Sequence, residues 1–234
     1  MAVNMDMDSS PAFTRIPPWV KAKLRPIAIE KIQQVYDWVE TECIPAERIY
    51  KAQLKDGKTR WNTPAIIHDL RKKAKAQGLW NLFLPKHFVE SPGLTNLEYS
   101  CCAEIMGRVY WAAQTMNCHA PETGNIELLA KYCTPEQKQK WLHPLMNGDM
   151  SSAYSMTEPD VASSDATQVG IKMEITDTEV IINGRKLYGN CQYNPEMQLF
   201  ILMGCSDPHN PNAWNRHTTL VVPANTPGSR KSAT

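Results

Sequence analysis

The sequence lacks both a long apolar run and an excess of charge of either sign. Nowhere does it contain the roughly 18 to 20 consecutive apolar residues that span a bilayer. Its 25 lysines and arginines almost balance its 24 aspartates and glutamates, so no basic patch for nucleic acid is indicated. The densest basic run, residues 71–75, falls in an amphipathic segment, which favours a solvated helix face. We therefore predict neither a membrane span nor a nucleic-acid partner.

Paired cysteines and clustered histidines are also lacking. The seven cysteines have no regular spacing, which is typical of reduced thiols in an intracellular protein rather than of a disulfide scaffold. Neither Cys101 with Cys102 nor Cys118 with His119 has the spacing of a zinc site. The six histidines are scattered, and only a constellation would indicate a ligand set or a catalytic base. We predict no metal site.

No targeting signal identifies a compartment. Residues 1–10 have neither an apolar run nor an arginine-rich amphipathic pattern. The last three residues, Ser232, Ala233 and Thr234, do not form a peroxisomal address. We expect an intracellular protein and leave mitochondrion, peroxisome and cytoplasm open.

The first half of the sequence has the period of helices. Residues 1–24 are polar, rich in proline and aperiodic, which predicts a flexible arm. Apolar residues then recur at three- and four-residue steps over 29–43, and residues 25–148 are predicted to form a helical domain.

Local start and stop signals support these helices. A threonine cap, a proline in the first turn and a glycine stop predict a second helix within 63–78. Thr95 begins a capping box that predicts a helix to about Met116, and Thr134 begins another.

The second half of the sequence has the period of strands. Apolar residues alternate with polar ones over 169–175, and further strand candidates lie at 180–182, 199–203 and 218–222. Asn183 and Gly184 form the strongest short hairpin signal, because both residue types tolerate positive φ. We predict a small antiparallel β domain over 149–228, followed by a polar tail at 229–234.

A loop crowded with hydroxyls lies where the two halves meet. Residues 154–166 read Tyr-Ser-Met-Thr-Glu-Pro-Asp-Val-Ala-Ser-Ser-Asp-Ala. Pro159 prevents a helix from continuing and favours an extended Glu158. The amides and hydroxyls left over must bond to water, to each other or to a bound molecule. The segment therefore indicates a ligand-holding loop, with an ordinary capped connection as the alternative.

Several segments, in this order and spacing, resemble the acyl-CoA dehydrogenase family of flavoproteins. These segments are residues 77–85, 132–138, 154–159, 182–186 and 221–228. Within the family, residues 160–167 (Asp-Val-Ala-Ser-Ser-Asp-Ala-Thr) are similar to the branch that includes the large vertebrate enzymes acting on long chains.

The resemblance implies an α+β multidomain fold. In the family a helical domain precedes a small β domain, which continues into more strands and a C-terminal helical bundle. The resemblance covers residues 25–228, so we expect an incomplete β domain and no C-terminal bundle. We interpret the chain as the N-terminal part of such an enzyme.

The resemblance also implies an oxidoreductase of lipid metabolism, with FAD as cofactor. The family oxidises acyl-CoA to trans-2-enoyl-CoA in fatty acid β-oxidation, with the α-hydrogen leaving as a proton and the β-hydrogen as hydride. The implied electron acceptor is an electron-transfer flavoprotein or oxygen, and the implied assembly a homo-oligomer.

Five positions are implied as flavin contacts. Tyr154, Met156 and Thr157 would lie along the isoalloxazine edge, with backbone amides on the pyrimidine side and the Thr157 hydroxyl near N5. Tyr188 stands where the family commonly has a tryptophan over the flavin, and Asn190 where it has a hydroxyl. An aromatic face and a hydrogen-bonding group are both kept. Tyr188 equally fits a strand residue of the β core.

Either Ser163 or Ser164 matches the serine that contacts acyl-CoA, and turn bonds to the backbone are the alternative for both. The base is implied in a later segment, so we assign no catalytic residue among Glu104, Glu122 and Glu158. Glu158 is interpreted as an orienting or salt-bridge residue. A second hypothesis is a catalytically inactive remnant, or an interaction module that pairs with a complete subunit.

Overall fold

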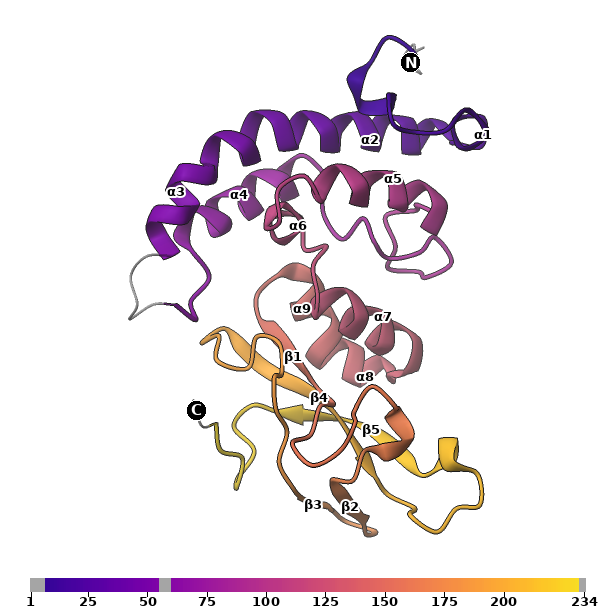
Figure 1. Cartoon of the computed structure of the whole chain (residues 1–234), viewed down its shortest axis with the longest axis vertical. Coiled ribbons are helices and arrows are strands. Elements are labelled where there is room, and N and C mark those ends of the chain that lie inside the picture. The colour runs from indigo at the N-terminus through magenta and orange to yellow at the C-terminus, as the bar shows by residue number, and fades with distance from the viewer. Residues whose placement is uncertain (1–6, 55–59, 232–234) are drawn as a thin grey trace. The chain divides into compact units, whose positions relative to one another are not determined.

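The computed structural model describes residues 7–54 and 60–231. The chain divides between Met146 and Asn147 into two compact units, called here the helical unit and the sheet unit (Figure 1). This order confirms the predicted α+β class. No helical bundle follows the sheet in the described part of the chain, and no helix there has the length and apolarity to cross a membrane.

The segment predicted to be a flexible arm is folded where the structure describes it. It forms two short helices, η1 (Pro11–Phe13) and α1 (Pro18–Lys21). Phe13 is completely buried, so apolar packing holds the segment in place. The prediction is wrong for residues 7–24, and residues 1–6 lie outside the described part.

The first long helix extends further than its apolar period indicated. It begins as α2 (Pro26–Trp38), passes through a π-helical turn, η2 (Val39–Cys43), and continues as α3 (Ile44–Leu54). The π-turn ends two residues before Pro45, which has no amide to donate to the preceding turn. A proline near the end of the period therefore widens the helix without ending it.

The Thr95 capping box is confirmed. The Glu98 amide donates to Thr95 Oγ1 at 3.2 Å, and the Glu98 carboxylate accepts from the Thr95 amide at 2.8 Å. The helix it starts, α5 (Asn96–Met106), lies beside α2 in Figure 1. It ends at Gly107, a weak helix former, and α6 (Ala112–Thr115) is separate. The single helix predicted to reach Met116 is therefore wrong.

The remaining helices also follow local signals. The Thr134 capping box is present, with the Gln137 amide donating to Thr134 Oγ1 at 3.3 Å. The elements are α4 (Ala65–Ala76), α7 (Glu122–Tyr132), α8 (Pro135–Gln137), the π-turn η3 (Lys138–Leu142) and α9 (His143–Asn147).

The sheet unit contains a mixed sheet rather than the wholly antiparallel one predicted. Its order is β1-β4-β2-β3, with β5 also paired to β4. β1 runs parallel to β4, while β5 is antiparallel to it. A long connection between β1 and β4 allows the parallel pairing, which a tight hairpin cannot make. The elements are β1 (Ser151–Ser155), η4 (Ala166–Gln168), β2 (Lys172–Ile175), β3 (Val180–Asn183), β4 (Met197–Cys205), η5 (Ala213–Asn215) and β5 (His217–Pro223).

The predicted hairpin turn at Asn183 and Gly184 is wrong. β2 and β3 instead turn at Thr176–Glu179, where the Thr176 amide donates to the Glu179 carbonyl at 2.9 Å. Gly184 follows β3 with φ +152°, and a Cβ there would lie 2.4 Å from Ile171 Cγ1. Glycine is required at this position for close packing, and not for the turn.

The core of the sheet unit confirms the alternation predicted for 169–175 only in part. Val169, Ile171 and Met173 are buried together with Leu202 and Val222 from the long strands. Ile175 is 57% exposed, because it lies at the end of β2 next to the solvent-facing turn.

Candidate functional site

The loop that follows β1 is closed by a serine hydroxyl. The Glu158 amide donates to Ser163 Oγ at 2.8 Å, and Ser163 Oγ donates to the Val161 carbonyl at 3.3 Å. Ser163 is buried, whereas Ser164 is exposed and has no hydrogen bond among the described residues. The turn bonding considered for both serines therefore applies to Ser163.

Asp165 continues this loop into η4. Its Oδ1 accepts from the Thr167 hydroxyl at 2.7 Å and from the Thr167 amide at 3.0 Å. These bonds lower the pKa of Asp165, the side-chain bond contributing most. The segment 163–168 is thus held by its own side chains.

A buried ion pair ties the start of the loop to more distant segments. Glu158 Oε1 accepts from Lys186 Nζ at 2.7 Å and from the Ile171 amide at 2.9 Å, and Oε2 accepts from the Gly170 amide at 2.8 Å. Lys186 Nζ also donates to the Met156 carbonyl at 2.8 Å. The Lys186 and Glu158 side chains are only 7% and 8% exposed. This pair confirms the interpretation of Glu158 as a salt-bridge residue.

The pKa values of the pair are shifted by opposing causes. Burial raises the pKa of Glu158, but the bonds from Lys186, Gly170 and Ile171 together outweigh it, so that pKa lies below its usual value. Burial lowers the pKa of Lys186 even though the carboxylate opposes the shift. The pair is ionic, because the carboxylate accepts three hydrogen bonds and the ammonium donates two.

The segment after Lys186 lies against the start of the loop that follows β1. The Leu187 amide donates to the Thr157 carbonyl at 2.8 Å, which brings Tyr188 next to the Thr157 segment in space. Tyr188 has φ +52° and is 87% exposed. This exposure contradicts its alternative interpretation as a strand residue of the β core. Asn190 is also exposed.

The three positions at the end of β1 differ in their surroundings. Tyr154 lies in β1 and is half-buried, and burial raises its pKa. Met156 packs its side chain against the core, and its carbonyl accepts from Lys186 Nζ. The hydroxyl and amide of Thr157 have no hydrogen-bond partner among the described residues. Thr157 therefore presents two donors on the segment that is bonded to Leu187, the residue before Tyr188.

Sequence reasoning did not find the contact between the two segments. Lys186 and Glu158 are 28 positions apart, and no periodic or capping signal acts over such a separation. The only signal was that both residues belong to the segments that carry the family resemblance.

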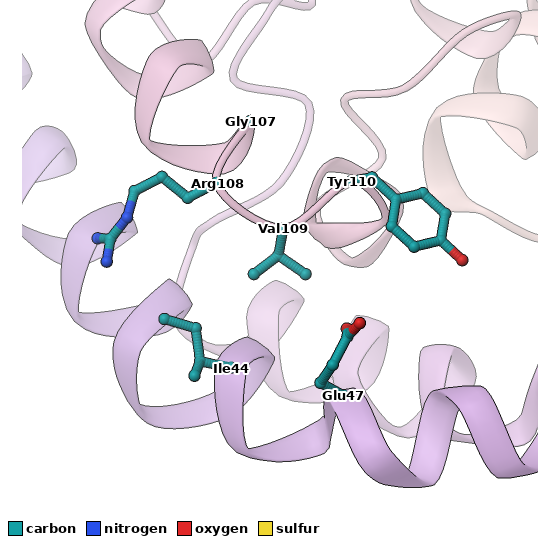
Figure 2. A pocket seen from close by; sticks show the side chains of 6 residues that line it. All are labelled: Ile44, Glu47, Gly107, Arg108, Val109 and Tyr110. Atoms are coloured by element: carbon teal, nitrogen blue, oxygen red, sulfur yellow. The ribbon is translucent and has the colours of Figure 1, made fainter.

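A separate cavity lies in the helical unit. It measures about 440 Å³ and is lined by Ile44, Glu47, Gly107, Arg108, Val109 and Tyr110 (Figure 2). Glu47 accepts from Trp111 Nε1 at 2.7 Å and pairs with Lys51 at 2.8 Å. Arg108 pairs with Glu40. Both charged side chains of the lining are therefore already engaged.

Comparison with known proteins identifies the family. The family model for the N-terminal domain of acyl-CoA dehydrogenases matches residues 28–149. This chain belongs to the acyl-CoA dehydrogenase family. The resemblance predicted from the sequence is thus confirmed.

Relatives extend this acyl-CoA dehydrogenase match into the sheet unit. Acyl-CoA dehydrogenase family member 11 of Gallus gallus is 41% identical over 204 residues, which cover 86% of this chain and 26% of the relative. An acyl-CoA dehydrogenase structure from Mycobacterium abscessus is 41% identical with a TM-score of 0.80. The match covers 86% of this chain and 51% of the chain in that structure. The chain thus spans about a quarter of one relative and half of the other.

A more distant structure shows the fold alone. The glutaryl-CoA dehydrogenase of Mycobacterium smegmatis, solved in complex with FADH2, is 17% identical with a TM-score of 0.66. It covers 89% of this chain and 48% of its own length.

Proposed function

We propose that the sheet unit forms one side of an FAD site and that the protein takes part in the oxidation of acyl-CoA to trans-2-enoyl-CoA. When bound, FAD supplies the two-electron acceptor for this reaction. An electron-transfer flavoprotein or oxygen as final acceptor, and assembly as a homo-oligomer, belong to the same proposal, as does a role in fatty acid β-oxidation.

The observation that carries the proposal is the meeting of the Thr157 and Tyr188 segments. The bond from the Leu187 amide to the Thr157 carbonyl holds them together and leaves the Thr157 amide and hydroxyl as donors. Donors at this position suit a flavin edge, because they stabilise the electron-rich reduced ring. The exposed Tyr188 ring offers an aromatic face for stacking, and Asn190 a polar side chain beside it.

Ser164 is the better candidate for the acyl-CoA contact. Ser163 is buried and uses its hydroxyl within the loop, whereas Ser164 is exposed. An exposed hydroxyl both donates and accepts, as a contact to a thioester or pantetheine amide requires.

Glu158 is not the base of the proposed reaction. Both its oxygens are held by Lys186, Gly170 and Ile171, and its side chain is 8% exposed. A base must reach the substrate proton at hydrogen-bond distance. Glu158 is therefore assigned to structure and not to proton abstraction.

FAD titration of the 234-residue chain tests the proposal, with flavin absorbance and fluorescence as readouts. Tyr188→Ala is expected to weaken FAD binding about tenfold by loss of ring stacking. Trp214→Ala is the matched control, because Trp214 is also an exposed aromatic of the sheet unit, at 74% against 87%. Wild-type protein that leaves the FAD spectrum unchanged would contradict the proposal. A stable complex with a complete subunit, seen by size-exclusion chromatography without flavin, would favour the interaction module instead.

A further inference from the structure

The Glu158–Lys186 pair joins three stretches of chain at one point. Through four hydrogen bonds it links the start of the loop after β1, the residues just before β2 and the segment after β3. Three of these bonds go to the backbone, at Met156, Gly170 and Ile171. The pair therefore fixes main-chain positions, which a contact between side chains alone would not do.

Stability alone is a poor explanation for this pair. Taking two charges out of water costs several kcal/mol, and apolar side chains of similar volume often replace a buried ion pair with no loss of stability. The surrounding core is already apolar, with Met156 packed against Ile171 and its neighbours. What an apolar pair cannot do is hold the Met156 carbonyl and the two amides in set directions.

The bonds continue directly into the candidate flavin edge. Lys186 holds the carbonyl of Met156, and the next residues of the two segments are joined by the Leu187 amide and the Thr157 carbonyl. Two consecutive links, 186 to 156 and 187 to 157, orient the Thr157 peptide. The Thr157 amide and hydroxyl have no hydrogen-bond partner among the described residues.

We propose that the Glu158–Lys186 pair is a positioning device that orients the Thr157 donors and the Tyr188 backbone for FAD before the cofactor binds. This inference rests on the proposed function. Glu158 and Lys186 act through the Thr157 and Tyr188 segments, so they are positioning residues and not catalytic ones. Preorganisation of this kind raises affinity by reducing the ordering cost on binding.

The net charge of the pair is zero, so removing either charge changes the charge beside the proposed flavin edge. The reduction potential of bound FAD is therefore a second readout. Lys186→Met leaves a buried carboxylate near the proposed flavin edge and disfavours a reduced, electron-rich ring, whereas Glu158→Gln leaves an ammonium and favours it. The charge change by itself is therefore expected to lower the reduction potential of bound FAD in Lys186→Met and to raise it in Glu158→Gln. Loss of the oriented Thr157 donors lowers the potential in every pair variant, so the double variant, whose net charge is unchanged, is expected to show this fall alone.

The experiment compares the 234-residue wild type with Lys186→Met, Glu158→Gln, the double variant and Val222→Ala. Val222→Ala removes buried methyl groups from the same core without touching the pair, so it serves as the stability control. Thermal unfolding, FAD affinity, FAD potential and amide exchange of the flavin-free protein are measured. We expect FAD affinity to fall about tenfold or more in all three pair variants. Stability is expected to recover partly in the double variant, which has no orphaned charge.

Faster exchange at 156–158 and 186–188 together with weaker FAD binding supports the inference. Wild-type affinity in the pair variants overturns it and leaves the proposed function intact. The inference is also overturned if Val222→Ala loses as much affinity at equal stability, or if the double variant keeps the wild-type potential of bound FAD. Wild-type protein that binds no FAD defeats the proposed function, and the cofactor role of the pair with it.

Discussion

Glu98 in the helical unit and Glu158 in the sheet unit are both buried carboxylates that pair with a basic side chain and accept backbone amides. Glu98 pairs with Arg25 and accepts from the amides of Thr95 and Arg25, which lie at the starts of α5 and α2. Glu158 accepts instead from Gly170 and Ile171, which join a loop to a strand. The same chemistry thus caps helices in one unit and orders the candidate site in the other.

The difference predicts which variants affect folding and which affect the site. Glu98 accepts hydrogen bonds from amides that have no intrahelical partner at the starts of helices. Its replacement is therefore expected to lower the stability of the fold. Glu158 holds the loop after β1 and lies two residues after Met156, at the candidate flavin edge. Its loss is expected to affect binding as well as stability.

The largest expected effect comes from removing the partner of Glu98. Arg25→Met leaves a carboxylate with 2% side-chain exposure, and breaking a buried pair typically costs about 3 kcal/mol or more. We expect a smaller loss than that, because 41% of the Arg25 side chain is exposed and water screens the loss. Denaturant unfolding followed by circular dichroism measures the change. As a control, the FAD affinity of Arg25→Met is measured under conditions where the protein is folded, and it is expected to be unaltered. A loss of affinity as large as that of the Glu158 and Lys186 variants would remove the distinction between Glu98 and Glu158.

A pH series sharpens the comparison. Arg25 and the Thr95 and Arg25 amides lower the pKa of Glu98 to about 2 from an ordinary 4.5, against burial. Its stabilising contribution is therefore complete above pH 4.5 and is lost as the pH falls towards 2. The stability difference between wild type and Glu98→Gln should shrink over that window by at most about 1.4 kcal/mol per pH unit. A difference that stays constant from neutral to acid would show that Glu98 has no lowered pKa.

The smallest expected effects separate the two serines of the loop. Ser163→Ala removes a buried acceptor for the Glu158 amide and should cost about 1 kcal/mol of stability. Ser164→Ala, at an exposed position, should leave stability within about 0.5 kcal/mol and weaken acyl-CoA binding. Thermal unfolding and calorimetric titration with an acyl-CoA measure both. Equal effects of the two changes on binding would contradict the assignment of Ser164.

Much of the helical unit was predictable because its signals are short-range. Both capping boxes act between residues three positions apart, and both are present. The apolar period of the first helix was also correct, although the π-turn before Pro45 carried the helix past the expected region. The burial of Phe13 was not predicted, because a single apolar residue among prolines forms no periodic pattern.

The sheet unit was less predictable, since its pairing depends on distant residues. β1 is built from Ser, Ala and Tyr with no β-branched residue, and it forms because β4 pairs along its length. The Asn183–Gly184 signal was overridden by the packing of Gly184 against Ile171. Which of Ser163 and Ser164 closes the loop likewise depended on the position of the Glu158 amide.

By itself the sequence determined the order of a helical and a β-rich half, most helix starts, and the family, because these depend on local periods, caps and ordered motifs. Only the tertiary structure decided the mixed strand pairing, the Glu158–Lys186 pair and the approach of Thr157 to the Tyr188 segment. The parallel strand pairings, the ion pair and the Leu187–Thr157 bond join residues 28 or more positions apart, and the Glu158 amide bonds join residues 12 and 13 apart. At such separations the meeting of two groups depends on how the whole sheet packs, and not on the residues between them.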